Sequence, residues 1–107
     1  NDFSEPQPDL VVVEDRDYSA AHPSPENVLL IVEIADSSAA YDRDIKLPLY
    51  ARHGIPEVWL VDLEAGKVEV HREPAGEVYN TGQIIRTGSV SPAFDREVCV
   101  DVGELLR

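Results

Sequence analysis

Apolar residues along this chain gather in short runs that are separated by polar, proline-containing segments. Residues 10–14 form a β-branched run, which predicts a strand, and the polar segment 15–27 predicts a connecting loop. Residues 28–35 are apolar at every position except Glu33. A strand without polar alternation is typical of one that is covered on both faces, so we expect this segment in the centre of a sheet.

A helix is predicted next, from Ser37 or Ser38 to about Arg52. A serine hydroxyl accepts hydrogen bonds from the first free N–H groups of a helix, and Gly54 favours a helix end. Pro48 lies inside this segment and predicts a bend, because an interior proline removes one hydrogen bond. Residues at four-residue spacing form the expected buried stripe: Tyr41, Ile45 and Leu49.

Further strands are predicted after the helix. Residues 57–62 and 67–72 favour a hairpin, in which Val68 and Val70 point inward and the polar residues between and beside them lie on a solvated face. Weaker candidates for strands are residues 77–80, 83–86 and 97–100, and residues 102–106 favour a terminal helical turn. Two strands, a helix and at least three strands predict an α+β fold, a mixed β-sheet with a helix packed on it.

Length and charge restrict the function. The chain has 107 residues, which predicts an extended lead over residues 1–8 and a single domain over residues 9–107. Its formal net charge of −12 predicts repulsion from DNA and from anionic membranes. The longest uncharged apolar run has only five residues, Val28 to Val32, so we expect no membrane span. A lone Cys99 fits a reducing cytoplasm, and we expect it to pack as a small apolar side chain.

The most informative residue is Glu33, because an isolated buried carboxylate costs several kcal/mol unless a partner compensates it. Asp9 precedes the first strand, so the two carboxylates would meet at one edge of the sheet if the two strands pair. A shared proton, a lysine or a divalent cation would then relieve their repulsion. Lys46 is the candidate lysine, and it lies four residues beyond Asp42 on the same helix face.

These residues stand in a pattern that resembles a known family. Pro8-Asp9 before a strand, Val32-Glu33-Ile34 near the end of the next one, and the segment from Asp42 to Asp62 are similar to the Uma2 family, whose members are described as putative bacterial endonucleases. The resemblance runs from about Pro8 to the C-terminus and is most specific between Val32 and Asp62. It implies a PD-(D/E)XK restriction-endonuclease-like core.

The resemblance also implies a site. Asp9, Glu33 and the backbone carbonyl of Ile34 would bind Mg²⁺ or Mn²⁺, hard cations that favour oxygen ligands. Asp9 and Glu33 would act in catalysis with Lys46, and Asp42 would be an auxiliary residue. The implied activity is metal-dependent hydrolysis of DNA phosphodiester bonds in the cytoplasm, by a homodimer.

The sequence departs from the family at two points. The lysine of the PD-(D/E)XK motif would fall at Ala35, although members of this family usually carry it on the following helix, as Lys46 does. Members also have an N-terminal helix and hairpin, so we expect a chain truncated at its N-terminus. These departures and the acidity favour an alternative: a catalytically inactive nuclease-fold domain that acts as a homo-oligomeric or protein-interaction module. Glu33 would then be a satisfied buried acid, and Asp42 and Lys46 a surface ion pair.

Overall fold

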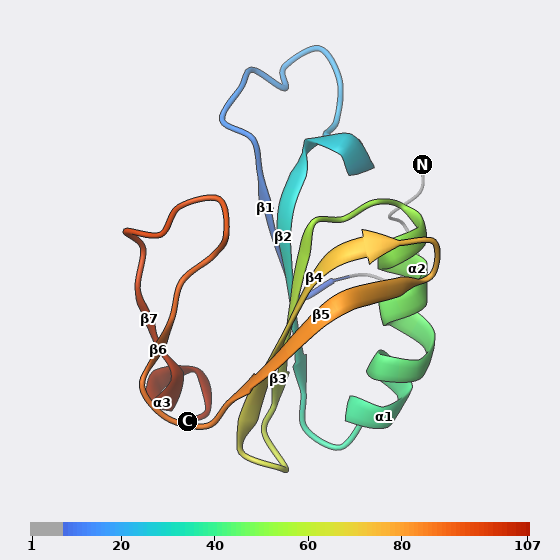
Figure 1. The fold of residues 1–107 in the computed structure, drawn as a ribbon. Helices are drawn as coiled ribbons and strands as arrows, with labels where there is room; N and C mark the ends of the chain where they lie inside the picture. Colours follow the sequence, from blue (N-terminus) through green and yellow to red (C-terminus); the bar gives the residue numbers. More distant parts are fainter. Residues whose placement is uncertain (1–7) are drawn as a thin grey trace.

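The fold is a five-stranded sheet with a helix on one face and the C-terminal segment on the other (Figure 1). The computed structural model describes residues 8–107, so the predicted lead over residues 1–8 lies outside the described residues except for Pro8. The sheet has the order β1-β2-β3-β4-β5. Its strands are β1 (Leu10–Val13), β2 (Val28–Ala35), β3 (Glu57–Asp62), β4 (Lys67–Ala75) and β5 (Val78–Ile85).

The sheet is mixed, as predicted. Strand β1 pairs antiparallel with β2, β2 pairs parallel with β3, and β3, β4 and β5 follow as antiparallel neighbours. The parallel pair requires a crossover, which the helical segment between β2 and β3 supplies. Strand β2 is therefore internal and buried, although β3 and not β2 occupies the centre of the sheet.

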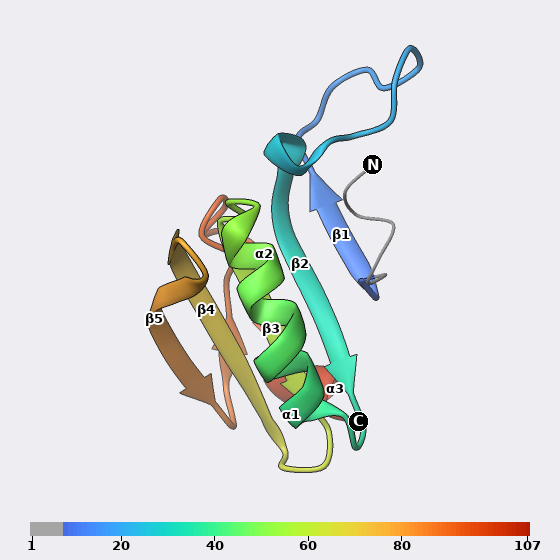
Figure 2. The same ribbon diagram turned by 90° about the vertical axis from the view of Figure 1, so that its right-hand side faces the viewer.

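The helical segment has three parts: α1 (Ala39–Tyr41), the π-helical turn η2 (Asp42–Lys46) and α2 (Leu47–Arg52). It lies across β3, with β2 on one side and β4 and β5 on the other (Figure 2). The π turn ends two residues before Pro48. Because the proline ring crowds the carbonyl four residues earlier, the irregularity predicted at Pro48 takes the form of a widened turn.

The predicted buried stripe of the helix is wrong. Tyr41 and Ile45 are 57% and 53% exposed. The buried residues of the helical segment lie one or two positions further along the chain: Asp42, Leu47, Tyr50 and Ala51. Tyr50 faces inward because Glu33 on the sheet accepts its hydrogen bond, and the buried carboxylate of Asp42 has Ser38 and Lys46 as partners. A search for apolar spacing alone therefore selects the wrong face.

Each face of the sheet has its own core. On the helix side, the buried cluster consists of Val28, Ile31, Leu47, Tyr50, Ile55 and Val58. On the other side it consists of Leu30, Val32, Trp59, Val61, Val68, Val70, Val90 and Val102. The second cluster is completed by the C-terminal elements β6 (Ser89–Val90), β7 (Val100–Asp101) and α3 (Val102–Leu105). A 3-10 turn, η1 (Pro25–Asn27), leads into β2.

Three local predictions need correction. The two separate strand candidates, residues 77–80 and 83–86, fall on one continuous strand, β5, which runs from Val78 to Ile85. The polar face of β4 is not wet throughout, because Glu69 is buried under the side chain of Arg43. Cys99 is exposed and does not pack as an apolar side chain. Within residues 8–107, no helix is long and apolar enough to cross a membrane.

Candidate active site

Glu33 is the centre of the candidate site. It lies on β2, faces the helix, and is 2% exposed. Its Oε1 atom accepts a hydrogen bond of 3.1 Å from the ammonium group of Lys46, and its Oε2 atom accepts one from the hydroxyl of Tyr50. Burial raises the pKa of Glu33 above the ordinary range, although the bonds from Tyr50 and Lys46 act in the opposite direction.

Lys46 lies between two buried carboxylates. Its Nζ atom is 3.1 Å from Glu33 and 3.3 Å from Asp42, whose other oxygen accepts a hydrogen bond from Ser38. Burial works to lower the pKa of Lys46, but the two carboxylates outweigh it and raise this pKa. Lys46 is therefore a fixed cation, and Asp42 is the residue that holds it against Glu33.

Tyr50 is the second hydrogen-bond partner of Glu33, and the residue pattern in the sequence did not identify it as a site residue. Its side chain is fully buried, and burial together with the charge of Glu33 raises the pKa of its phenol strongly. The phenol therefore stays protonated and donates to Glu33 at any physiological pH. Its spacing carried a signal, since Asp42, Lys46 and Tyr50 recur every four residues along the helix.

Asp9 lies next to this group on the neighbouring strand end. One of its carboxylate oxygens accepts a hydrogen bond of 2.7 Å from the backbone N–H of Ile34. Strands β1 and β2 do pair, with Leu10 opposite Val32, so the condition for Asp9 to approach the end of β2 is met. Asp9 is exposed, whereas Glu33 is buried. The two residues therefore offer one carboxylate that solvent reaches, Asp9, and one that the helix covers, Glu33.

The chemistry of these donors fits a hard cation. A carboxylate has about four lone-pair sites, and Lys46 and Tyr50 occupy two of those on Glu33. Asp9 uses one of its acceptor sites for the backbone N–H of Ile34, and its other lone pairs are available to a cation. Across residues 8–107, however, no three His, Cys, Asp or Glu side chains gather closely enough to form a metal site by themselves. A cation here would need backbone or water oxygens in addition to the two carboxylates.

Ala35 occupies the position at which the PD-(D/E)XK pattern would have a lysine. Ala35 is fully buried and lies in register with Asp62. The charge that a lysine would supply there comes instead from Lys46, which reaches Glu33 from the helix above. The structure thus places Lys46 in contact with Glu33 and Asp42, and Asp9 against the backbone N–H of Ile34, the residue that follows Glu33.

The family is decided by comparison with known proteins. The chain matches the family model Uma2, described as a putative restriction endonuclease, over residues 1–102. This chain belongs to the Uma2 family. No curated protein matches it.

A solved structure shares the Uma2 fold seen here. It is described as a putative nuclease belonging to DUF820 from Anabaena variabilis. It is 19% identical in sequence, with a TM-score of 0.58 over 74% of this chain and 44% of that chain. The likeness confirms the predicted nuclease-like α+β fold. The present chain spans less than half the length of that neighbour.

Proposed function

We propose that this domain is a metal-dependent endonuclease that hydrolyses DNA phosphodiester bonds at the site around Glu33. The observation that supports this most strongly is the contact between Lys46 and Glu33, with Asp9 on the adjoining strand end. Two carboxylates and a partly buried lysine supply both the oxygen ligands and the positive charge that phosphoryl chemistry requires. Membership in a family described as restriction endonucleases points the same way.

In this proposal Asp9, Glu33 and the carbonyl of Ile34 hold Mg²⁺ or Mn²⁺. When bound, such a cation lowers the pKa of a coordinated water and offsets negative charge on the phosphate. The protein's own contribution is to keep Glu33 ionised and oriented. Tyr50 does this from the core by donating to the oxygen that Lys46 does not occupy.

Lys46 is the residue that we expect to face the phosphate. Its ammonium group has three donors, and the contacts with Glu33 and Asp42 use two of them. The third is free to orient an attacking water or to stabilise charge in the transition state. Asp42 acts as a positioning residue, because removing it would leave Lys46 tethered on one side only.

The net negative charge of the chain opposes DNA binding, but a dimer could gather basic side chains from two copies on one surface. Strand β1 is an edge strand with Leu10 and Val11 exposed, and such an edge favours pairing with a second copy. We propose a cytoplasmic homodimer, in which two basic residues of the helix, Arg43 and Lys46, would contribute to a shared basic groove.

Plasmid cleavage tests the proposal. The unaltered chain should cut supercoiled plasmid in Mg²⁺ or Mn²⁺ and not in excess chelator. Lys46→Ala should lower the cleavage rate at least 100-fold, whereas Arg52→Ala should leave it within twofold. Arg52 is the matched control, because it is a basic residue of the same helix that pairs at the surface with Glu77. Equal rates for the two variants would contradict the proposed role of Lys46.

A second candidate function is a binding module without catalysis. Two observations favour it: Ala35 replaces the strand lysine, and Glu33 already has protein partners on both oxygens. In that case no cation is needed to stabilise the fold. Absence of cleavage, together with an unchanged melting temperature in Mn²⁺, would support this candidate.

A further inference from the structure

A pocket of about 340 Å³ lies on the helix side of the sheet, between η2 and the outer strands β4 and β5. Its wall carries three basic side chains, Arg43 from the helix and Lys67 and His71 from β4. Gly82 and Ile84 of β5 complete it. Because the helix lies between this pocket and β2, the pocket is separate from the site around Glu33 (Figure 2).

A buried carboxylate forms the base of the pocket. Glu69 contacts Arg43 through two guanidinium nitrogens, at 3.2 and 2.8 Å, and also contacts Lys67 at 3.2 Å and His71 at 3.0 Å. Burial raises the pKa of Glu69, but the three basic partners outweigh it and lower this pKa to about 2. Within residues 8–107, no other carboxylate has three basic partners.

The charges are layered by depth. Glu69 and Asp62, which is 3.8 Å from Arg43, have side chains only 6% and 7% exposed. The basic side chains above them are more accessible: the side chain of Arg43 is 38% exposed, and those of Lys67 and His71 are 18% and 19% exposed. An approaching anion therefore meets Arg43, Lys67 and His71 first, with the carboxylates holding these side chains in place beneath.

The donors match a group with several oxygens. Arg43 keeps its third guanidinium nitrogen, and Lys67 keeps two ammonium protons beyond its contact with Glu69. His71 donates from Nε2–H to Glu69, so its Nδ1 carries a second donor only when the ring is protonated. Donors from two separate residues, Arg43 and Lys67, suit a tetrahedral phosphate better than a planar carboxylate, which one arginine satisfies alone.

We propose that this pocket binds a backbone phosphate of the nucleic acid, other than the one that is cleaved. The inference rests on the proposed nuclease function. Glu33 and Glu69 are both in register with Leu60, two strands apart. At about 4.8 Å per strand the two rows lie roughly 10 Å apart, which corresponds to a few nucleotides at about 3.4 Å of rise each. The pocket would thus fix the register of the strand relative to the scissile bond.

Charge placed at the pocket tests the inference without removing any contact described above. Ile84 lines the pocket and is 56% exposed, so Ile84→Glu adds a carboxylate beside the bound phosphate. Val78 of the same strand is 57% exposed and lies outside the pocket lining, so Val78→Glu is a control with equal charge. Thermal unfolding of both variants establishes that each one folds.

Binding of a short fluorescent DNA duplex is measured by anisotropy in a Glu33→Gln background, which prevents cleavage. Ile84→Glu should weaken binding at least tenfold and Val78→Glu less than twofold. Lys67→Gln should reduce the slope of log K against log salt by about 0.9, the value for one phosphate contact. Equal weakening by the two glutamate variants would overturn the inference, because it would indicate general repulsion.

A separate measurement distinguishes this inference from the nuclease proposal. If the chain cleaves DNA, Ile84→Glu should raise KM at least tenfold and leave kcat within twofold. If the chain binds the duplex but never cleaves it, the nuclease proposal fails, and the two glutamate variants still decide whether the pocket binds phosphate. A duplex that does not bind at all overturns the pocket as well.

Discussion

Two buried glutamates, Glu57 and Glu33, lie on adjacent strands of the sheet and face opposite sides. Glu57 on β3 is 1% exposed and Glu33 on β2 is 2% exposed. Glu57 faces the C-terminal segment, and Glu33 faces the helix. Burial and residue type do not separate them, so any difference in role comes from their partners.

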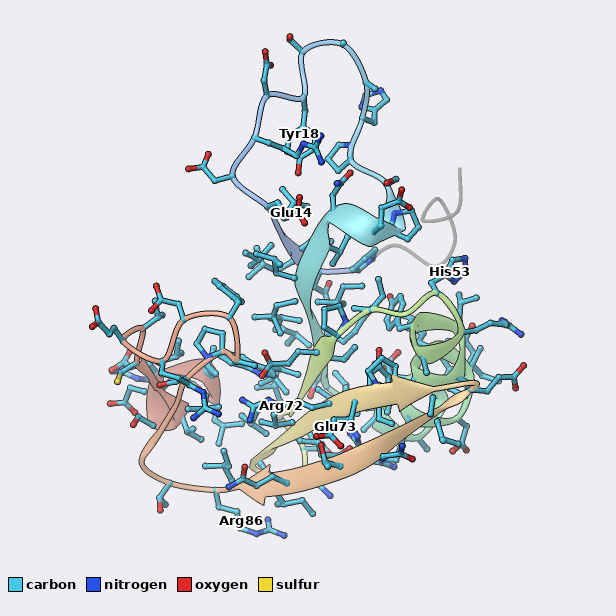
Figure 3. All side chains as sticks on the ribbon, turned by 45° about the horizontal axis from the view of Figure 1, so that its top comes forward. Glu14, Tyr18, His53, Arg72, Glu73 and Arg86 are labelled. Carbon is cyan, nitrogen blue, oxygen red and sulfur yellow. The ribbon has the colours of Figure 1, made fainter. Side chains whose placement is uncertain are left out.

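The partners of Glu57 join parts of the fold. Its Oε2 atom accepts from the indole N–H of Trp59 at 2.8 Å and from Arg72 at 2.9 Å, and its Oε1 atom accepts from the backbone N–H of Ala93 at 2.8 Å. Arg72 also donates to the carbonyl of Ser91, and it extends from β4 toward the C-terminal segment (Figure 3). These contacts attach residues 91–93 to the sheet.

The partners of Glu33 come from a single helical segment and are groups that can donate or exchange a proton. The ammonium group of Lys46 and the phenol of Tyr50 both donate hydrogen bonds to Glu33, and the exposed Asp9 lies on the adjoining strand end. The comparison teaches that a buried carboxylate bound to arginine, indole and backbone is part of the scaffold. A buried carboxylate bound to lysine and phenol near an exposed acid has the composition of a reactive site.

The largest effect on stability is expected at Glu57. Glu57→Gln removes the charge that compensates Arg72, which should lower the free energy of unfolding by about 3 to 5 kcal/mol. Urea denaturation measures this. Glu77→Gln, at a glutamate whose side chain is 60% exposed, should change it by less than about 0.5 kcal/mol. A small effect at Glu57 would remove the contrast between a structural and a functional carboxylate.

The next effect is pH-dependent and concerns Glu69. Its folded pKa of about 2 lies below the ordinary value of 4.5, so its ionised form stabilises the fold above about pH 4.5, and this stabilisation is lost as the pH falls toward 2. Glu69→Gln should therefore cost about 3 kcal/mol at pH 6 and progressively less in acid.

Urea denaturation at several pH values, with the exposed Glu104→Gln as control, measures the Glu69 effect. A cost for Glu69→Gln that stays the same from pH 6 to pH 3 would show that the three basic partners do not hold the carboxylate ionised.

A smaller effect is expected at Tyr50. Its hydroxyl lowers the pKa of Glu33, so Tyr50→Phe should raise that pKa further. Protonated Glu33 cannot bind a cation, and the acid limb of the rate profile should move to higher pH. The cost in stability should be about 1 to 2 kcal/mol.

Tyr79→Phe is the matched control for Tyr50→Phe, because the Tyr79 hydroxyl donates to the carbonyl of Ile55 and not to Glu33. The rate of plasmid cleavage against pH gives the comparison. If the acid limb of Tyr50→Phe coincides with that of Tyr79→Phe, Glu33 is not the group that titrates.

Much of the fold followed from local pattern. The unbroken apolar run of residues 28–35 predicted an internal strand, and its single carboxylate, Glu33, predicted a compensating partner. The pairing of β1 with β2 brought Asp9 to Ile34, and the four-residue spacing of Asp42 and Lys46 gave their contact. Each of these features depends on the residue pattern within one strand or one helix, or on the pairing of two consecutive strands.

The failures arose where polar side chains face inward. Tyr50 and Glu69 read as surface or neutral positions in the sequence, since their partners lie 17 and 26 residues away in the chain. Periodicity assigns the apolar face to the core, so it selected Ile45 and not Lys46 as the residue that faces the sheet. Only the fold shows that the helix covers carboxylates.

Calorimetric titration with Mn²⁺ is the most direct test of the claim that Glu33 belongs to a cation site. The unaltered chain should bind one Mn²⁺ with micromolar to millimolar affinity, and Glu77→Gln should bind equally well. Glu33→Gln should not bind, although it folds. Equal binding by all three, or no binding by the unaltered chain, would contradict the account.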